Sequence, residues 1–272
     1  MDPRFARHIA ACNNAVLPGE RLAFLIGADH VGWVKPALAR ALCDFDAAFT
    51  AAAAGERITL RQDAAADLPE LALAMVERGF GRRRGEEFDV RATPDGPALA
   101  RIDRGMLPSF GILATGVHVN GLVRRADGLH VWIARRSPHK ALDPGKLDHI
   151  VAGGVCAGMD VRGTLLKEAA EEASLPAALA ARAVETGQVG YAMERGEGLR
   201  RDRLHCFDLE LPEDFVPRAG DDEVEAFEVW PIQKAFETVR DTDDFKFNVN
   251  LVLIDLFGRL GMLKTAKASG AI

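Results

Sequence analysis

The alternation of apolar and polar residues along the chain predicts many short strands and several amphipathic helices. Two short strands flank Gly27 and are expected to form a hairpin, and residues 67–77 carry apolar side chains at helical spacing. Residues 49–54 are expected to continue a preceding helix or to form a second one. The other strands are predicted over 58–61, 88–92, 112–123, 129–134, 186–193 and 204–211, and the other helices over 36–45, 177–183, 232–239 and 248–260.

One helix, preceded by a glycine-containing loop, carries the pattern that points to chemistry. It is expected to begin after Asp160, whose side chain can cap the first turn, and to end before Pro176. At roughly 100° per residue, Glu168, Glu171 and Glu172 lie within about 100° of one another on one face. The opposite side, which we expect to pack against a sheet, comprises Leu166, Ala169, Ala170 and Ala173.

Three carboxylates on one helix face repel one another, and a divalent cation between them would remove the repulsion. Mg²⁺ and Mn²⁺ prefer carboxylate oxygens, so Glu168, Glu171 and Glu172 are predicted to bind Mg²⁺ or Mn²⁺ and to be catalytic. Gly153 and Gly154 allow the backbone to approach a ligand closely, and we predict substrate contacts there. A solvated acidic face is the simpler alternative, but a glycine loop at this offset favours the metal site.

A basic stretch lies ahead of the acidic helix. Arg136 and Lys140 belong to it, and they are predicted to bind the phosphate groups of a diphosphate substrate. An Arg side chain can hold phosphate oxygens through two hydrogen bonds, and a Lys side chain acts as a mobile positive charge. The alternative is that these charges only keep the surface solvated.

Residues 153–175 resemble the Nudix box, which reads Gly, five residues, Glu, seven residues, Arg-Glu, an apolar residue, any residue, Glu-Glu, any residue, Gly, an apolar residue. Six of the nine defined positions match, including the three carboxylates that bind metal in Nudix hydrolases. Lys167 replaces the Arg and keeps its charge, whereas Met159 replaces a Glu and Ser174 a Gly. The resemblance implies an α+β Nudix fold, in which a mixed β-sheet lies between helices as an α/β/α sandwich.

Longer segments, among them WIARRSPHK, PGKLDHIVAGGVCAGM and DDEVEAFEVW, are similar to the thiamine-pyrophosphokinase-related branch of Nudix proteins. That branch implies a small α+β domain over 1–108, a Nudix hydrolase domain over 109–262 and a tail over 263–272. It also implies hydrolysis of thiamine diphosphate, or its damaged or oxidised analogues, to the monophosphate and phosphate. Nudix proteins commonly carry a further catalytic carboxylate in a late loop, for which Glu223 is favoured over Glu225.

Three other functions stay open at this point. A pyrophosphatase for ADP-ribose or nucleotide sugars would use the same carboxylates. Met159 and Ser174 are the features that suggest a weakly active binding module with the Nudix fold. An isomerase of allylic diphosphates would need an acid–base group at the pocket, for which Cys156 is the candidate.

Composition narrows the class of protein. The 272 residues are 48% hydrophobic and 27% charged, as in ordinary globular proteins, and the net charge of −6 argues against a broad nucleic-acid-binding surface. Four widely spaced cysteines and the lack of a long apolar run argue against a disulfide framework and a transmembrane helix. We therefore expect a cytoplasmic protein that acts on a small-molecule diphosphate, without nucleic-acid or membrane partners, and whose assembly into a homodimer is left open.

Overall fold

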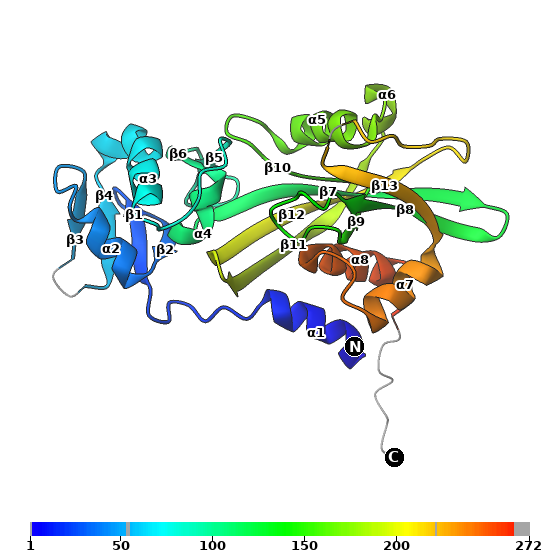
Figure 1. Ribbon diagram of the computed structural model, residues 1–272, viewed down its shortest axis with the longest axis horizontal. Coiled ribbons are helices and arrows are strands. Elements are labelled where there is room, and N and C mark those ends of the chain that lie inside the picture. Colours follow the sequence, from blue (N-terminus) through cyan, green and yellow to red (C-terminus); the bar gives the residue numbers. More distant parts are fainter. Residues whose placement is uncertain (1, 53–54, 221, 264–272) are drawn as a thin grey trace, which may run out of the picture.

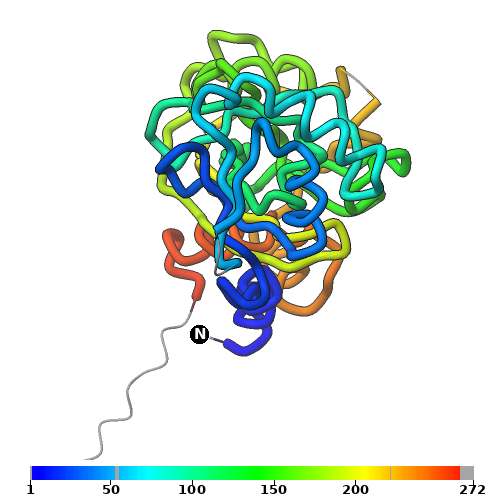
Figure 2. Tube along the Cα trace, turned by 90° about the vertical axis from the view of Figure 1, so that its left-hand side faces the viewer, coloured from blue at the N-terminus to red at the C-terminus, as the bar shows by residue number. Residues whose placement is uncertain are grey.

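The computed structural model describes residues 2–52, 55–220 and 222–263, in which two units lie end to end (Figure 1). The smaller unit, at the left of Figure 1, contains the blue and cyan part of the chain after its first helix. The larger unit is a long sheet with helices on both faces. In the view onto the smaller unit, the blue and cyan segments lie in front of the larger sheet (Figure 2).

The smaller unit is built around a four-stranded sheet, in which the predicted hairpin is confirmed. β1 (Leu22–Ile26) pairs with β2 (Asp29–Val34) in antiparallel fashion and with β4 (Arg57–Leu60) in parallel. β5 (Glu87–Val90) and β6 (Ala100–Asp103) form a separate two-stranded sheet. The remaining elements are α2 (Pro36–Leu42), β3 (Phe49–Ala51), the 3₁₀ turns Gln62–Asp67 and Arg104–Met106, α3 (Leu68–Glu77) and α4 (Leu107–Phe110). The fully buried core includes Phe24, Ile58, Leu60, Leu68 and Met75.

The larger unit is centred on the long hairpin of β7 (Leu113–Arg125) and β8 (Gly128–Arg136). The other elements are β9 (Leu147–His149), β10 (Val151–Gly154), α5 (Val161–Ala173), α6 (Ala177–Ala180), β11 (Val184–Arg195), β12 (Gly198–Glu210), β13 (Val224–Pro231), α7 (Ile232–Asp241) and α8 (Phe247–Arg259). Strands β11-β12-β7-β8-β13 are neighbours in this order, while β10 pairs with β7 and β9 with β8. Because β12 is parallel to β7 and the other pairs are antiparallel, the sheet is mixed.

Helices cover both faces of this sheet, which confirms the predicted layered fold. α5 and α6 lie on one face, and α7 and α8 on the other (Figure 1). Leu165 of α5 shares a buried cluster with Val117 and Val119 of β7, because alternate residues of a strand point to the same face. On the other face, Val249 of α8 packs in a cluster with Val131 of β8.

The first helix, α1 (Pro3–Cys12), packs with the larger unit although it precedes the smaller one. Its Phe5 is 2% exposed and lies in the cluster formed by α7, α8 and β8. The boundary near residue 108 stays a prediction. The structure adds that α1, although it belongs to the segment before that boundary, packs against the unit that follows it. Most of the predicted tail, from residue 264 onward, lies outside the described residues.

The structure contradicts the helix predicted over 49–54. Phe49–Ala51 is strand β3, antiparallel to β4, and Phe49 is 3% exposed in the core. The alanine-rich composition favours a helix locally, but pairing with β4 overrides that preference. Among the described residues, every helix is too short or too polar to cross a membrane.

Candidate active site

Helix α5 is set by local signals that the sequence displays. It begins at Val161 because Asp160 accepts a hydrogen bond on Oδ1 from the Gly163 amide, at 2.6 Å. It ends at Ala173 because Ser174 adopts the left-handed conformation, with φ of 51°. Glu168 and Glu172 of this helix project toward β10.

The three predicted carboxylates differ in burial. The side chain of Glu168 is 12% exposed, that of Glu171 is 50% exposed, and Glu172 is 8% exposed as a residue. Glu172 accepts a hydrogen bond on Oε2 from the Ala152 amide of β10, at 2.8 Å. The carboxylate face and the packed face of α5 therefore adjoin each other.

The predicted apolar side of α5 is corrected in part by this geometry. Ala169 and Ala173 are buried as expected, whereas Ala170 is exposed and Leu166 is half-buried. Leu165 is fully buried instead. The packed face is rotated toward the glutamates because β10 lies directly beneath them.

Gly153 and Gly154 lie in β10, and each leaves room for a side chain of the protein itself. A Cβ added at Gly153 would lie 2.3 Å from Cγ of Glu168. A Cβ added at Gly154 would lie 2.5 Å from Cζ of Phe88, which belongs to the smaller unit. The substrate contacts predicted for the two glycines stay a prediction, and the structure gives each a packing role.

Lys167 neutralises part of the carboxylate set. Its Nζ donates to Oε1 of Glu168 at 3.1 Å and to Oε2 of Glu171 at 2.6 Å. The hydrogen bond to Glu171 and the nearby negative charges raise the pKa of Lys167, so that it stays protonated. An ammonium group thus lies where carboxylate oxygens converge.

Burial makes the carboxylate charges costly. Burial raises the pKa of Glu168, and it raises the pKa of Glu172 well above the usual range, with further repulsion from Asp148, Glu168 and Glu223. A cation is what stabilises such groups in the charged form. Glu168 and Glu172 lie against β10, and Glu171 is joined to Glu168 through the Lys167 ammonium. Carboxylate oxygens are the donor type that fits a hard divalent cation such as Mg²⁺ or Mn²⁺.

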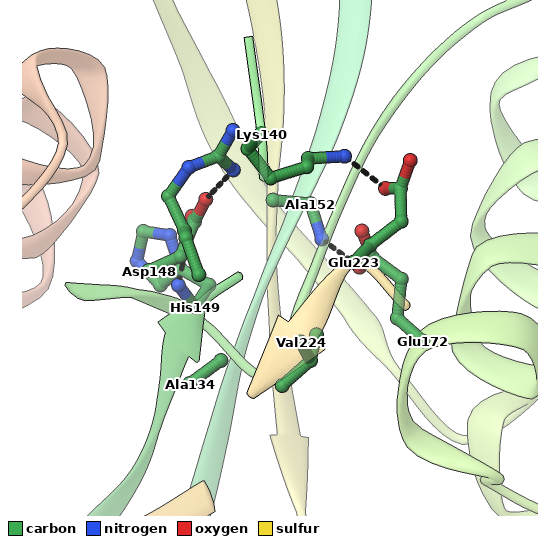
Figure 3. Close-up of a pocket in the computed structure, with 9 residues that line it drawn as sticks. Ala134, Lys140, Asp148, His149, Ala152, Glu172, Glu223 and Val224 are labelled. Atoms are coloured by element: carbon green, nitrogen blue, oxygen red, sulfur yellow. Dashed lines mark hydrogen bonds and ion pairs between the residues drawn. The ribbon is translucent and has the colours of Figure 1, made fainter. Parts of the chain in front are cut away.

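A small pocket beside Glu172 brings two further predicted residues together (Figure 3). Lys140 and Glu223 form an ion pair there, and both line the pocket with Glu172. The late carboxylate favoured from the sequence, Glu223, thus lies in the same pocket as Glu172, whereas Glu225 does not line this pocket. The catalytic role of Glu223 stays a prediction. Lys140 is positioned to meet an anion that enters beside Glu172.

The guanidinium group of Arg136 donates hydrogen bonds to other groups of the protein. Its Nη1 donates to Oδ2 of Asp148 at 2.7 Å, and its Nη2 and Nε donate to the carbonyl oxygens of Leu142 and Asp143 at 2.8 and 3.1 Å. These bonds hold the loop that carries Lys140. Phosphate binding by Arg136 stays a prediction, and it would require some of these bonds to break.

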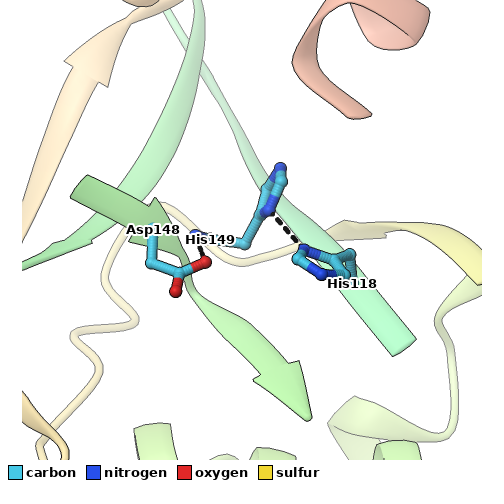
Figure 4. Close-up of side chains that lie close together, drawn as sticks. All are labelled: His118, Asp148 and His149. Atoms are coloured by element: carbon cyan, nitrogen blue, oxygen red, sulfur yellow. Dashed lines mark hydrogen bonds between the residues drawn. The ribbon is translucent and has the colours of Figure 1, made fainter. Parts of the chain in front are cut away.

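Asp148 and two buried histidines form a second group of ligand-type atoms (Figure 4). One ligand atom from each of His118, Asp148 and His149 lies within 4.8 Å of the others. However, Asp148 already pairs with Arg136 and with Lys246, at 2.7 and 3.4 Å. A divalent cation here would add to two buried positive charges, which disfavours metal binding by this group. Metal binding by the α5 glutamates stays a prediction.

Burial keeps the two histidines neutral. It lowers the pKa of His149 to about 4 and that of His118 well below its usual value. Their Nδ1 atoms are 2.9 Å apart, so one donates to the other. The sequence pattern did not point to Asp148 or Lys246. The available signal for a buried charge is local, because Lys246 lies between Phe245 and Phe247, and Asp148 follows Leu147.

A larger cleft lies between the two units, at the start of α5. About 210 Å³ of it can be occupied by water-sized spheres. The smaller unit, the loop before α5 and the strands β7 and β12 contribute its lining. The lining residues are Phe88, Asp89, Arg91, Pro94, Asp95, Leu113, Thr115, Val155, Met159, Asp160, Val161 and His205. Apolar and polar side chains contribute equally to this lining, so the cleft can contact both an apolar ring and polar groups of a small molecule.

Comparisons with known proteins find relatives along almost all of the chain. The family model described as the NUDIX domain matches residues 114–250, and one described as a domain of unknown function, DUF4743, matches residues 4–114. Nudix hydrolase 24, chloroplastic, of Arabidopsis thaliana is 37% identical over 270 residues, which cover 96% of this chain and 73% of the relative. Nudix hydrolase 20, chloroplastic, of the same plant is 34% identical over 275 residues, which cover 96% of this chain and 74% of the relative. The crystal structure of a MutT protein from Methanosarcina mazei Go1 is 16% identical with a TM-score of 0.42, and the match covers 56% of this chain and 96% of that chain.

The comparisons contradict the predicted location. Both plant relatives are named as chloroplastic, which conflicts with the expectation of a cytoplasmic protein. The cysteine spacing and the apolar pattern on which that expectation rested do not distinguish the two compartments.

Proposed function

This chain belongs to the Nudix hydrolase family and is a pyrophosphohydrolase, and we propose that its substrate is thiamine diphosphate or a damaged or oxidised analogue of it. The products would be the corresponding monophosphate and phosphate. The observation that carries the proposal is the cleft at the start of α5, whose walls suit a heterocyclic group next to the carboxylate helix. The similarity of several segments to the thiamine-related branch supports the same substrate.

The lining of the cleft favours a positively charged organic group over a further phosphate. Asp89, Asp95 and Asp160 outnumber the single lining arginine, Arg91. Asp89 contacts Arg91 at 2.7 Å and Arg101 at 3.8 Å, and Asp95 pairs with Arg203 at 3.2 Å. Among the described residues, Asp160 is therefore the lining aspartate whose charge has no ion pair. We therefore expect a preference of about tenfold for a cationic heterocycle, which corresponds to roughly 1.4 kcal/mol.

The same lining offers little for an adenine base. Adenine commonly stacks on an exposed aromatic face. Phe88 supplies a ring to the cleft, but it is 4% exposed because it packs on Gly154. This is the reason that a pyrophosphatase for ADP-ribose or nucleotide sugars is the less favoured substrate assignment.

The carboxylate set and its neighbours account for the chemistry. Glu168, Glu171 and Glu172 are proposed to hold Mg²⁺ or Mn²⁺, which when bound would neutralise diphosphate oxygens and make a coordinated water more acidic. Lys140 lies beside Glu172 and Glu223 and can meet the terminal phosphate. Water attacks the terminal phosphorus, the bridging P–O bond breaks, and its electron pair stays with the monophosphate. The proton of the water passes to a carboxylate of the set formed by Glu168, Glu171, Glu172 and Glu223.

A substrate panel tests the proposal. Phosphate release and the organic product are measured with thiamine diphosphate, oxidised thiamine diphosphates, ADP-ribose and a nucleotide sugar, each with Mg²⁺, with Mn²⁺ and with a chelator. We expect kcat/KM to be at least about tenfold higher for a thiamine compound and to vanish with the chelator. Faster hydrolysis of ADP-ribose would refute the substrate, and binding without phosphate release would indicate a binding module. Sedimentation analysis of the same sample tests whether the chain assembles into a homodimer.

A further inference from the structure

The smaller unit contacts the loop that precedes the carboxylate helix. The amide of Ala157 donates to the carbonyl oxygen of Glu87 in β5 at 2.8 Å, and the amide of Gly158 donates to Oδ2 of Asp89 at 3.3 Å. The ring of Phe88 fills the space over Gly154. These contacts fix the residues just before β5 beside the start of the active-site helix.

Glu86, immediately before β5, points its carboxylate at this loop. Its Oε1 accepts from Sγ of Cys156 at 2.9 Å, and its Oε2 pairs with Nη1 of Arg104 at 2.7 Å. The side chain is one-third exposed, so its position is fixed and still reachable from solvent. The smaller unit thus presents a carboxylate to Cys156, in the loop that also carries Met159.

Charges show that Glu86 and the α5 cluster influence each other. Burial opposes ionisation of Glu86, but the hydrogen bond from Cys156 and the charges of Arg104 and Lys167 hold its pKa below the usual value. The charge of Glu86 in turn contributes to the raised pKa of Glu168. The geometry agrees, because Glu168 lies over Gly153, Phe88 lies over the adjacent Gly154, and Glu86 contacts Cys156 two residues further along.

Lys167 presents a problem for metal binding that Glu86 can resolve. Its ammonium group lies on Glu168 and Glu171, whose oxygens a divalent cation would need. A cation that takes these oxygens repels the ammonium, which must move. Lys167 has a long flexible side chain that is 40% exposed, so it is free to swing toward another carboxylate.

We propose that Glu86 is a positioning residue of the active site, which receives the Lys167 ammonium when a divalent cation replaces it on Glu168 and Glu171. The inference rests on the metal site of the proposed function but not on the identity of the substrate. The smaller unit would then contribute directly to metal binding. Its Glu86 carboxylate would pair with the displaced Lys167 ammonium, so that no unpaired positive charge stays beside the bound cation.

A double-mutant cycle with Mn²⁺ alone as the probe tests this contribution. Mn²⁺ affinity is measured by calorimetry or by the loss of the free-ion electron paramagnetic resonance signal, without any diphosphate. In the otherwise unchanged protein, Glu86→Gln should weaken Mn²⁺ binding about tenfold, whereas in a Lys167→Met background it should change the affinity less than about twofold. Glu86→Asp, which keeps the charge, should recover part of the loss.

Glu87→Gln is the matched control, because Glu87 is the adjacent residue and contacts Arg101 at 3.9 Å. It should bind Mn²⁺ as the unchanged protein does. The Gln at position 86 still accepts a hydrogen bond from Cys156, and circular dichroism checks that the variant folds. An equal loss in both backgrounds, or no loss in either, overturns the inference.

The failure of the metal site is distinguishable from the failure of this inference. If Glu172→Gln binds Mn²⁺ as tightly as the unchanged protein, the metal site itself is wrong and the role of Glu86 falls with it. If Glu172→Gln abolishes binding and the cycle shows no coupling, only the role of Glu86 is refuted. A negative result in the thiamine panel affects neither measurement.

Discussion

The substitution Gly153→Ala tests whether the position of Glu168 controls turnover. The new Cβ would lie 2.3 Å from Cγ, 2.4 Å from Cδ and 2.7 Å from Oε2 of Glu168. Ordinary contact between carbon atoms begins at about 3.5 Å, so the Glu168 side chain must retreat by more than about 1 Å. Gly153 lies in strand β10 and does not adopt the left-handed conformation, so the backbone itself accepts alanine.

The expected result is a loss of turnover with little loss of stability. A displacement of about 1 Å in a catalytic group costs about 100-fold in rate, or roughly 2.7 kcal/mol in the activation free energy. The free energy of unfolding should change by no more than about 1 kcal/mol, since the clash falls on a flexible side chain that can move. Steady-state kinetics with the best diphosphate of the panel and urea unfolding measure the two quantities.

Gly190→Ala is the matched control for this prediction. Gly190 also lies in a strand, β11, and the nearest atom to its added Cβ is the carbonyl oxygen of Asp202 at 3.9 Å. This variant should keep both kcat and stability. Wild-type kcat in Gly153→Ala would refute the reasoning, because it would mean that Glu168 reacts equally well from a displaced position.

Three further changes test the charges around the site. Glu172→Gln keeps a hydrogen-bond acceptor for the Ala152 amide and removes a charge that burial disfavours. The Tm without metal should therefore stay the same or rise. In thermal scans with Mn²⁺, the increase of Tm that metal binding causes should disappear. Asp148→Asn leaves Arg136 and Lys246 without their shared counter-charge. The free energy of unfolding, measured by urea titration, should fall by about 3–5 kcal/mol. A loss below about 1 kcal/mol would contradict the buried ion pair. Burial lowers the pKa of His149 to about 4, so its stabilising contribution is present above the unfolded-state pKa of about 6.5 and is lost as the pH falls toward 4. Urea unfolding across this window should show a loss on the order of 3 kcal/mol that His149→Gln reduces, and an equal slope in both proteins would assign it to other groups.

The active-site helix was predictable because its determinants are local. Asp160 caps the first turn and Ser174 ends the helix, and both signals lie within a few residues of the boundary they set. The spacing of Glu168, Glu171 and Glu172 on one face follows from helix geometry alone. The spacing does not reveal where β10 packs against the helix. That packing buries Glu172 and leaves Glu171 half exposed.

Arg136 shows why a charge in the sequence does not reveal its partner. Its place in a basic stretch suggests phosphate binding, whereas the structure pairs it with Asp148. The pairing of β8 with β9 sets Ala134 opposite Asp148 and so brings the two charges together. The identity of the charged residues is local information, but their pairing depends on strand register across a loop that the hydrophobic pattern leaves undefined.

The two adjacent glycines show the same limit between the two units. Both suggested close approach of a ligand, because a glycine leaves space beside the backbone. The sequence does not show whether a ligand or another side chain fills that space. In the structure, Gly153 makes room for Glu168, fifteen residues further along the chain, and Gly154 makes room for Phe88 of the smaller unit. The second contact joins segments about seventy residues apart, as does the hydrogen bond between Cys156 and Glu86. The end of β10 and the loop after it are therefore a contact between the two units, and a substitution at Gly154 would disturb the packing of Phe88 beside the carboxylate helix.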